Sequence, residues 1–284
     1  MDASDAALRN ISDTAFWVAA YRARETARAD ALFRDPLARR LAGRRGAAIA
    51  DGLTPDHRQE WAFTTRTVLF DALIDAEVGR GVDVVVNLAA GLDTRPYRMD
   101  LPSSLQWIEV DLPPLIAYKE AQLRDESPRC ALERVGLDLS DRPARQALFE
   151  RIATRGTNVM IVTEGLLIYL SREEVGALAE DLAAHASFES WAVDVVSPGL
   201  MRMMQRQYGT KLDDAAAPFR FAPEEGPAFY TRYGWAPARV ESVFKTARRL
   251  RRLPFPLNLL AMLPEPKRPR PGRVWSGICL LLHE

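Results

Sequence analysis

The stretch VVVNLAAGLDTRPYR, residues 84–98, decides the fold of this chain. Its first part, Val84–Leu88, is almost entirely apolar and β-branched, which is typical of a strand buried on both faces of a parallel sheet. The small residues Ala89, Ala90 and Gly91 follow at once and predict a tight turn into a helix. A strand that ends in such a turn is the start of a βαβ unit, and ligands bind at this edge of an open parallel sheet.

The same rhythm continues along the chain. Short apolar runs at residues 107–110, 135–137, 159–163 and 191–196 alternate with helical patterns, and two later strands are expected at 239–244 and 274–282. The pattern predicts an α/β fold with a doubly wound, Rossmann-like sheet.

Two regions depart from this rhythm. Residues 1–80 hold helical patterns and no strand candidate, so we expect an N-terminal helical cap that contributes to a ligand site, followed by a core at 81–284. Residues 198–230, which carry Met201, Met203 and Met204, predict either a lid insertion over a pocket or an irregular helical connection. The run 264–272 is rich in proline and basic residues and is expected to be a solvated loop rather than a docking segment.

Bulk composition excludes several classes of protein. The 284 residues carry 38 basic and 38 acidic side chains, a formal net charge of zero that disfavours nucleic-acid binding. No apolar run reaches the length of about 18 residues that spans a bilayer, and the N-terminus lacks a signal-peptide pattern, so we expect a cytoplasmic protein without membrane contact. The two cysteines are expected to be free thiols, and no metal-ligand cluster stands out.

The position of an acidic residue indicates the kind of ligand that this site binds. Asp111 ends the second strand 20 positions after Gly91, a spacing at which a carboxylate accepts hydrogen bonds from ribose hydroxyls. The turn lacks the three glycines of a dinucleotide site, and Asp93 would repel a diphosphate. These residues favour S-adenosylmethionine, which has a ribose and no phosphate, over a nicotinamide or flavin cofactor and over a purely structural turn.

Several ordered motifs resemble the leucine carboxyl methyltransferase family, and in particular its bacterial branch, which includes polyketide carboxyl O-methyltransferases similar to the tetracenomycin enzyme. The resemblance covers about residues 15–200 and rests on residues 22–38, Arg66-Thr67 with Asp71, and segments 87–98, 107–113 and 163–170. It implies a class I methyltransferase sheet of about seven strands, mostly parallel, with an antiparallel last strand.

The resemblance also implies a set of cofactor-binding residues, which comprises Arg24, Arg66, Ala89, Gly91, Asp111, Asp138, Leu139 and Glu164. In this set Asp138 and Leu139 hold the adenine, Arg66 binds the methionyl carboxylate and Glu164 lies near the methionyl amino group. Without the resemblance, the sequence favours Asp138 as a helix-entry carboxylate beside Ser140. For Arg66, a half-buried position at the edge of an apolar helix stripe is compatible with a pocket, and a snorkelling surface arginine is the rival interpretation. Arg24 is one of three neighbouring arginines that the resemblance does not separate.

The sequence and the resemblance together predict an O-methyltransferase that uses S-adenosylmethionine, releases S-adenosylhomocysteine and acts on a carboxylate or hydroxyl of a small secondary metabolite. A protein C-terminal carboxyl methyltransferase and a non-catalytic cofactor-binding scaffold are the alternatives. No catalytic residue is assigned, although His57 is the better of the histidines as a base, and the sequence leaves the oligomeric state open.

Overall fold

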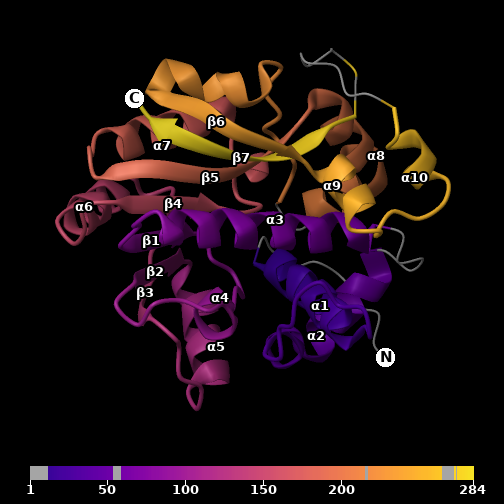
Figure 1. The fold of residues 1–284 in the computed structure, drawn as a ribbon, viewed down its shortest axis with the longest axis horizontal. Helices are drawn as coiled ribbons and strands as arrows, with labels where there is room; N and C mark the ends of the chain where they lie inside the picture. Colours follow the sequence, from indigo (N-terminus) through magenta and orange to yellow (C-terminus); the bar gives the residue numbers. More distant parts are fainter. Residues whose placement is uncertain (1–11, 54–58, 215–216, 264–271, 273) are drawn as a thin grey trace.

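A seven-stranded sheet forms the centre of the molecule (Figure 1). The computed structural model describes residues 12–53, 59–214, 217–263, 272 and 274–284. The strands are β1 (Val84–Leu88), β2 (Gln106–Asp111), β3 (Ala131–Gly136), β4 (Val159–Thr163), β5 (Phe188–Val196), β6 (Trp235–Ser242) and β7 (Ser276–His283).

Helices connect and cover these strands. They are α1 (Asp13–Ala27), α2 (Ala38–Leu53), α3 (Glu60–Gly79), α4 (Arg95–Arg98), α5 (Pro113–Leu123), α6 (Arg142–Ala153), α7 (Arg172–Ala183), α8 (Pro198–Asp214), α9 (Val243–Arg249) and α10 (Leu257–Leu260), with 3-10 turns η2 (Leu167–Tyr169) and η3 (Gly226–Tyr233).

The strand order is β3-β2-β1-β4-β5-β7-β6. The first five strands pair in parallel, whereas β7 is antiparallel to both of its neighbours, β5 and β6. The order reverses between β1 and β4, so a switch point lies beyond the carboxyl ends of these two strands. The predicted sheet, with an antiparallel last strand, is confirmed.

Alternation along the strands sends side chains to two different cores. On β1, Val84, Val86 and Leu88 join a cluster with α6, α7 and η3 on one face of the sheet. Val85 points to the other face, into a cluster with the α3 residues Phe70 and Leu73. Because every residue of β1 is buried, its sequence shows no polar face.

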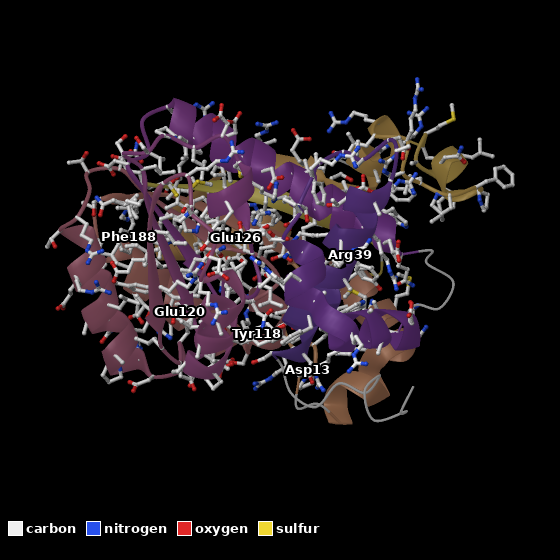
Figure 2. The ribbon with its side chains drawn as sticks, turned by 90° about the horizontal axis from the view of Figure 1, so that it is seen from below. Asp13, Arg39, Tyr118, Glu120, Glu126 and Phe188 are labelled. Atoms are coloured by element: carbon white, nitrogen blue, oxygen red, sulfur yellow. The ribbon has the colours of Figure 1, made fainter. Side chains whose placement is uncertain are left out.

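The N-terminal helices form two distinct groups. α1 and α2 pack on each other and on α5, where the Tyr118 hydroxyl donates to the Leu41 carbonyl over 2.8 Å. Figure 2 shows Tyr118 of α5 beside the helices that carry Asp13 and Arg39. In contrast, α3 lies along the sheet (Figure 1), so the proposed division after residue 80 separates this helix from the strands that it covers.

Several local predictions need correction. β3 begins at Ala131, four residues before the expected run, and β6 covers 235–242 because Ser242 caps α9 and ends the strand before Val243. Asp141 caps α6, accepting from the Ala144 amide. The proposed lid region holds α8 and η3, and residues 264–271 lie outside the described chain. Among the described residues no helix has the length and apolar character needed to span a membrane.

Candidate functional site

A cavity of about 830 Å³ lies at the carboxyl ends of the parallel strands. Its wall is formed by the turn after β1, the ends of β2, β4 and β5, and side chains from α1, α3 and α8. Most of the predicted cofactor residues line it, namely Arg66, Ala89, Gly91, Asp111, Asp138, Leu139 and Glu164. The fold therefore collects these residues from distant segments at the switch point.

The turn after β1 brings bare backbone to the cavity. Ala89 and Gly91 both have φ of 53°, in the left-handed region that favours glycine. A side chain on Gly91 would also approach the Cβ of Ala15 to 3.2 Å. The alanine at position 89 therefore holds a conformation that glycine adopts more easily, and it adds a methyl group to the cavity wall.

Asp111 is fixed by backbone amides. Its Oδ2 accepts from the Gly91 amide over 2.6 Å and its Oδ1 accepts from the Leu112 amide over 2.7 Å. Burial raises the pKa of Asp111, and these two hydrogen bonds oppose the rise without cancelling it. Since each carboxylate oxygen accepts more than one hydrogen bond, both remain able to bind ribose hydroxyls.

The two residues expected at the adenine follow β3. Asp138 is exposed, and its Oδ1 accepts from the Ser140 amide over 2.9 Å. This contact is the helix-entry role that the residues alone suggest, yet Asp138 also lines the cavity. Leu139 lies beside it, half-buried, with its carbonyl accepting from Arg145 over 2.6 Å.

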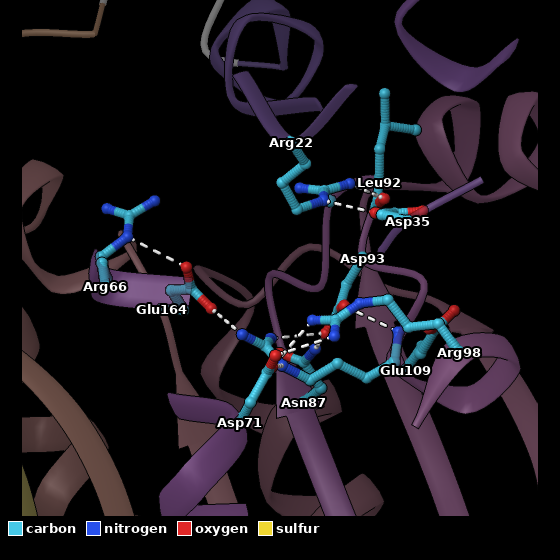
Figure 3. Close-up of polar contacts among 12 residues, drawn as sticks. Arg22, Asp35, Arg66, Asp71, Asn87, Leu92, Asp93, Arg98, Glu109 and Glu164 are labelled. Carbon is cyan, nitrogen blue, oxygen red and sulfur yellow. Dashed lines mark hydrogen bonds and ion pairs between the residues drawn. The ribbon is translucent and has the colours of Figure 1, made fainter. Parts of the chain in front are cut away.

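Charged side chains that border the cavity form a continuous network (Figure 3). Glu164 joins two arginines, accepting from Arg66 Nε over 2.9 Å and from an Arg95 terminal nitrogen over 2.8 Å. Arg95 in turn donates to Asp71 and Asp93 over 2.7 and 2.8 Å. Burial alone would lower the pKa of Arg95, but the surrounding carboxylates raise it well above its usual value.

Asp93 has a different role from the one that its position in the sequence suggests. Burial tends to raise its pKa, but Arg95, Lys119 and Arg98 hold it well below the usual range. Its Oδ2 also accepts from the Asn87 side-chain amide over 2.8 Å. Because Arg95 pairs with Asp93, the charge of this carboxylate is offset inside the network, so the missing glycines are the stronger argument against a dinucleotide.

Arg22, not Arg24, lies at the cavity. Arg22 is buried, and its guanidinium donates to Asp35 over 2.8 Å and to the Leu92 carbonyl over 2.5 Å (Figure 3). Arg24 is not among the described lining residues and pairs with Asp51 and Glu60 over 2.5 Å each. Arg24 therefore lies outside the described cavity lining, and the positions of the two arginines around α1 are what separate them.

Asp194 is a cavity residue that the sequence analysis did not select. It lies on β5, and its Oδ1 accepts from the Gly165 amide over 3.0 Å. The sequence does contain an indication of this role. Asp194 is a charged residue within the apolar run 191–196, just as Glu164 is a charged residue that directly follows the apolar run of β4. His57 lies outside the described residues, and within the described ranges no group of three acidic, histidine or cysteine side chains is arranged to hold a metal.

Comparison with known proteins shows that the chain is similar to methyltransferases. The model of the leucine carboxyl methyltransferase family matches residues 15–183. A Frankia alni protein named as an S-adenosyl-L-methionine-dependent methyltransferase is 38% identical over 183 residues, and the match covers 60% of this chain and 63% of that protein. The chain thus spans about 63% of the length of this relative. A Mycobacterium bovis BCG protein of the same name is 31% identical over 242 residues, covering 79% of this chain and 78% of that protein.

Solved structures share the fold at low sequence identity. A DUF574 family protein from Streptomyces avermitilis superposes with a TM-score of 0.59 at 13% identity, covering 94% of this chain and 97% of that one. A Thermobifida fusca protein named as a methyltransferase gives a TM-score of 0.54 at 14% identity, covering 85% of this chain and 89% of that one. The Rossmann-like class I methyltransferase architecture predicted from the sequence is confirmed.

Proposed function

Because this chain belongs to the leucine carboxyl methyltransferase family, we propose that it is an S-adenosylmethionine-dependent O-methyltransferase that acts on a small secondary metabolite. The observation that carries the proposal is the pairing of Asp111 with the Gly91 amide at the switch point of the sheet. This pairing fixes a buried carboxylate beside bare backbone, where a nucleoside can bind closely. S-adenosylmethionine, when bound, supplies both the methyl carbon and the leaving group.

The residues around the cavity fit this cofactor along its length. Asp111 would bind the ribose diol, Asp138 and Leu139 would bind the adenine edge, and Arg66 would bind the methionyl carboxylate. An arginine fork suits a carboxylate because two parallel hydrogen bonds can form. Glu164 accepts from Arg66 and lies at the same wall, where it would meet the methionyl amino group.

Cavity size and chemistry support a small acceptor. Pockets for small ligands have volumes of about 300–1,000 Å³, so a cavity of about 830 Å³ has room for the cofactor and a compact second molecule. Beyond the charged wall the lining is apolar and aromatic, with Trp17, Phe63 and Phe219 among its residues. Such a lining favours an apolar metabolite over the C-terminal peptide of a protein, and room for a second molecule beside the cofactor favours an enzyme over a scaffold.

Calorimetric titration tests the proposal. We expect S-adenosylmethionine and S-adenosylhomocysteine to bind the wild-type protein and NAD not to bind. Asp111→Ala should abolish the binding of both nucleosides, whereas Asp125→Ala, at an acid far more exposed than Asp111, should leave it unchanged. Binding of NAD alone, or nucleoside binding that survives Asp111→Ala, would refute the proposed cofactor site.

A further inference from the structure

Asp194 presents a carboxylate to the cavity that the cofactor roles leave unused. It follows Val193, which pairs with Thr163 at the carboxyl end of β4. Alternation along β5 points Asp194 to the same face of the sheet as Ala192, and this is the face that α3 and Arg66 cover. Its Oδ1 is held by the Gly165 amide, whereas its Oδ2 lies 3.5 Å from an Arg66 terminal nitrogen.

Charge pairing in the cavity wall disfavours an anionic acceptor. Every arginine among the described lining residues is already engaged by acids: Arg22 by Asp35, Arg95 by Asp71, Asp93 and Glu164, Arg142 and Arg145 by Asp181, and Arg66 by Glu164 and Asp194. Arg66 would also receive the methionyl carboxylate. A carboxylate acceptor would lie beside Asp194, a like charge, and would find no unengaged arginine among the described lining residues, so its countercharge would be the sulfonium of the cofactor alone.

The aromatic lining of the cavity favours an apolar ring compound as the acceptor. Two aromatic pairs border the cavity, Trp17 with Phe63 at 5.1 Å between ring centroids and Tyr169 with Phe219 at 5.6 Å. Met203 and Met204 also line it and adapt to irregular apolar surfaces. Aromatic side chains favour offset or edge contacts with another ring, so a ring system suits this wall.

From these contacts we propose that the methyl acceptor is a hydroxyl group on an apolar aromatic molecule and that Asp194 is the base that accepts its proton. This inference rests on the proposed methyl transfer. The O–H bond breaks and its proton passes to Asp194 Oδ2, while the acceptor oxygen forms a bond to the methyl carbon. The carbon–sulfur bond breaks with its electron pair remaining on sulfur, and Asp194 then releases the proton to solvent.

The surroundings of Asp194 suit this task. Burial raises its pKa, and although Arg66 and the Gly165 amide oppose the rise, the pKa remains above its usual value. A base whose pKa lies closer to neutral accepts a proton from a hydroxyl more readily. The titratable and charged groups that face Asp194 from the packed elements are Arg66, Glu164, Tyr169, Tyr230 and Cys279.

Two ring compounds that differ only in their reacting group provide the test. We would use 2-hydroxyanthraquinone and anthraquinone-2-carboxylic acid with the wild-type protein, Asp194→Asn and, as a control on the same strand, the exposed Glu189→Gln. The asparagine keeps an oxygen that can accept from the Gly165 amide but cannot take a proton at neutral pH. Calorimetry with S-adenosylhomocysteine and thermal melting would show that each variant folds and retains the cofactor site.

We expect the wild-type protein to methylate the hydroxyl compound and not the carboxylate. Asp194→Asn should lower kcat by about 10²–10⁴-fold with little change in KM, and the rate loss of the wild type at acid pH should be absent from the variant. In complexes with S-adenosylhomocysteine, the carboxylate compound should bind Asp194→Asn roughly tenfold more tightly than wild type because a like charge has been removed. Glu189→Gln should match the wild type throughout.

Three outcomes would overturn the inference: methylation of the carboxylate compound, an unchanged kcat in Asp194→Asn, or failure of both rings to bind the complex with S-adenosylhomocysteine. Each leaves the cofactor assignment intact if the nucleoside binds. Failure of S-adenosylhomocysteine to bind the wild-type protein would instead refute the proposed function itself.

Discussion

Replacement of Arg95 by methionine removes a guanidinium that three carboxylates share. The side chain of Arg95 is 3% exposed, and its nitrogens lie 2.7–2.8 Å from oxygens of Asp71, Asp93 and Glu164. Removing one partner of a buried ion pair destabilises a protein by about 3–5 kcal/mol, because an uncompensated charge is left behind.

The expected loss of stability corresponds to one buried ion pair rather than to three. Asp71 retains Arg98, and Glu164 retains Arg66, so Asp93 is the acid that loses its main cation. For Arg95→Met we therefore expect the free energy of unfolding to fall by about 3–5 kcal/mol. At about 2–4 °C per kcal/mol, the melting temperature should fall by roughly 6–20 °C.

The stability difference between Arg95→Met and the wild type should depend on pH, and the pKa of Asp93 determines the direction of this dependence. In the wild type the pKa of Asp93 lies below its ordinary value of 3.8, so the stabilisation by Arg95 is present above that value and is lost as the pH falls through the lowered pKa. In Arg95→Met, burial raises the pKa of Asp93 above its wild-type position, although Lys119 and Arg98 still oppose the rise. The difference in the free energy of unfolding between variant and wild type should therefore be smaller at pH 5 than at pH 7.5, because a buried carboxyl with fewer cations around it takes up a proton more readily as the pH falls.

Urea unfolding at both pH values measures the difference. Arg155→Met is the matched control, because Arg155 pairs with Glu133 near the surface and such pairs contribute only about 0–1 kcal/mol. A loss below 1 kcal/mol for Arg95→Met, or a difference from wild type that is the same at both pH values, would refute the reasoning.

Three further predictions concern the cofactor site. Asp111→Asn should weaken S-adenosylhomocysteine binding about 10–100-fold in calorimetry, since hydrogen bonds to a charged group contribute about 1.5–3 kcal/mol. Because the pKa of Asp111 is raised, binding by the wild-type protein should also weaken as the pH falls and Asp111 takes up a proton. An unchanged affinity of Asp111→Asn for S-adenosylhomocysteine would contradict the ribose contact. Gly91→Ala should lower the free energy of unfolding by about 1–2 kcal/mol in urea titrations, because the φ of 53° at position 91 strains an alanine and the new Cβ would contact Ala15. A variant as stable as the wild type would exclude this strain. Arg22→Met should weaken nucleoside binding whereas Arg24→Met should not, and the reverse result would restore Arg24 to the cofactor site.

The strands that could be predicted most closely are those buried on both faces. For β4 the sequence predicts 159–163, the bounds that the structure shows, because each of its residues is buried and an apolar run precedes Thr163. β3 lies at an edge of the sheet and is largely half-exposed, so it tolerates the charged residues Glu133 and Arg134. These residues break the apolar run, and the sequence pattern therefore misses the first four residues of the strand. Strand bounds predicted from apolar runs are therefore accurate where the strand is buried and less accurate where it is exposed to solvent.

The site divides along similar lines. Gly91 and Asp111 were found because the turn and the next strand fix their separation in the fold, and local spacing carries that information. Arg22 and Arg24 differ by two positions, so only the packing of α1 decides which one reaches the cavity. Asp194 meets Arg66 from a strand 128 positions away, and no local spacing links the two.

The place of β7 between β5 and β6 has a consequence for the order of assembly in the cell. During synthesis, residues 235–242 leave the ribosome well before residues 276–283, yet β6 pairs with the sheet through β7. Until that last segment emerges, the edge of β5 with Trp191 and Val193 has no neighbour on this side. Unpaired apolar edges attract other chains, so a stalled or slowly translated message would produce a nascent chain that depends on a chaperone at this edge.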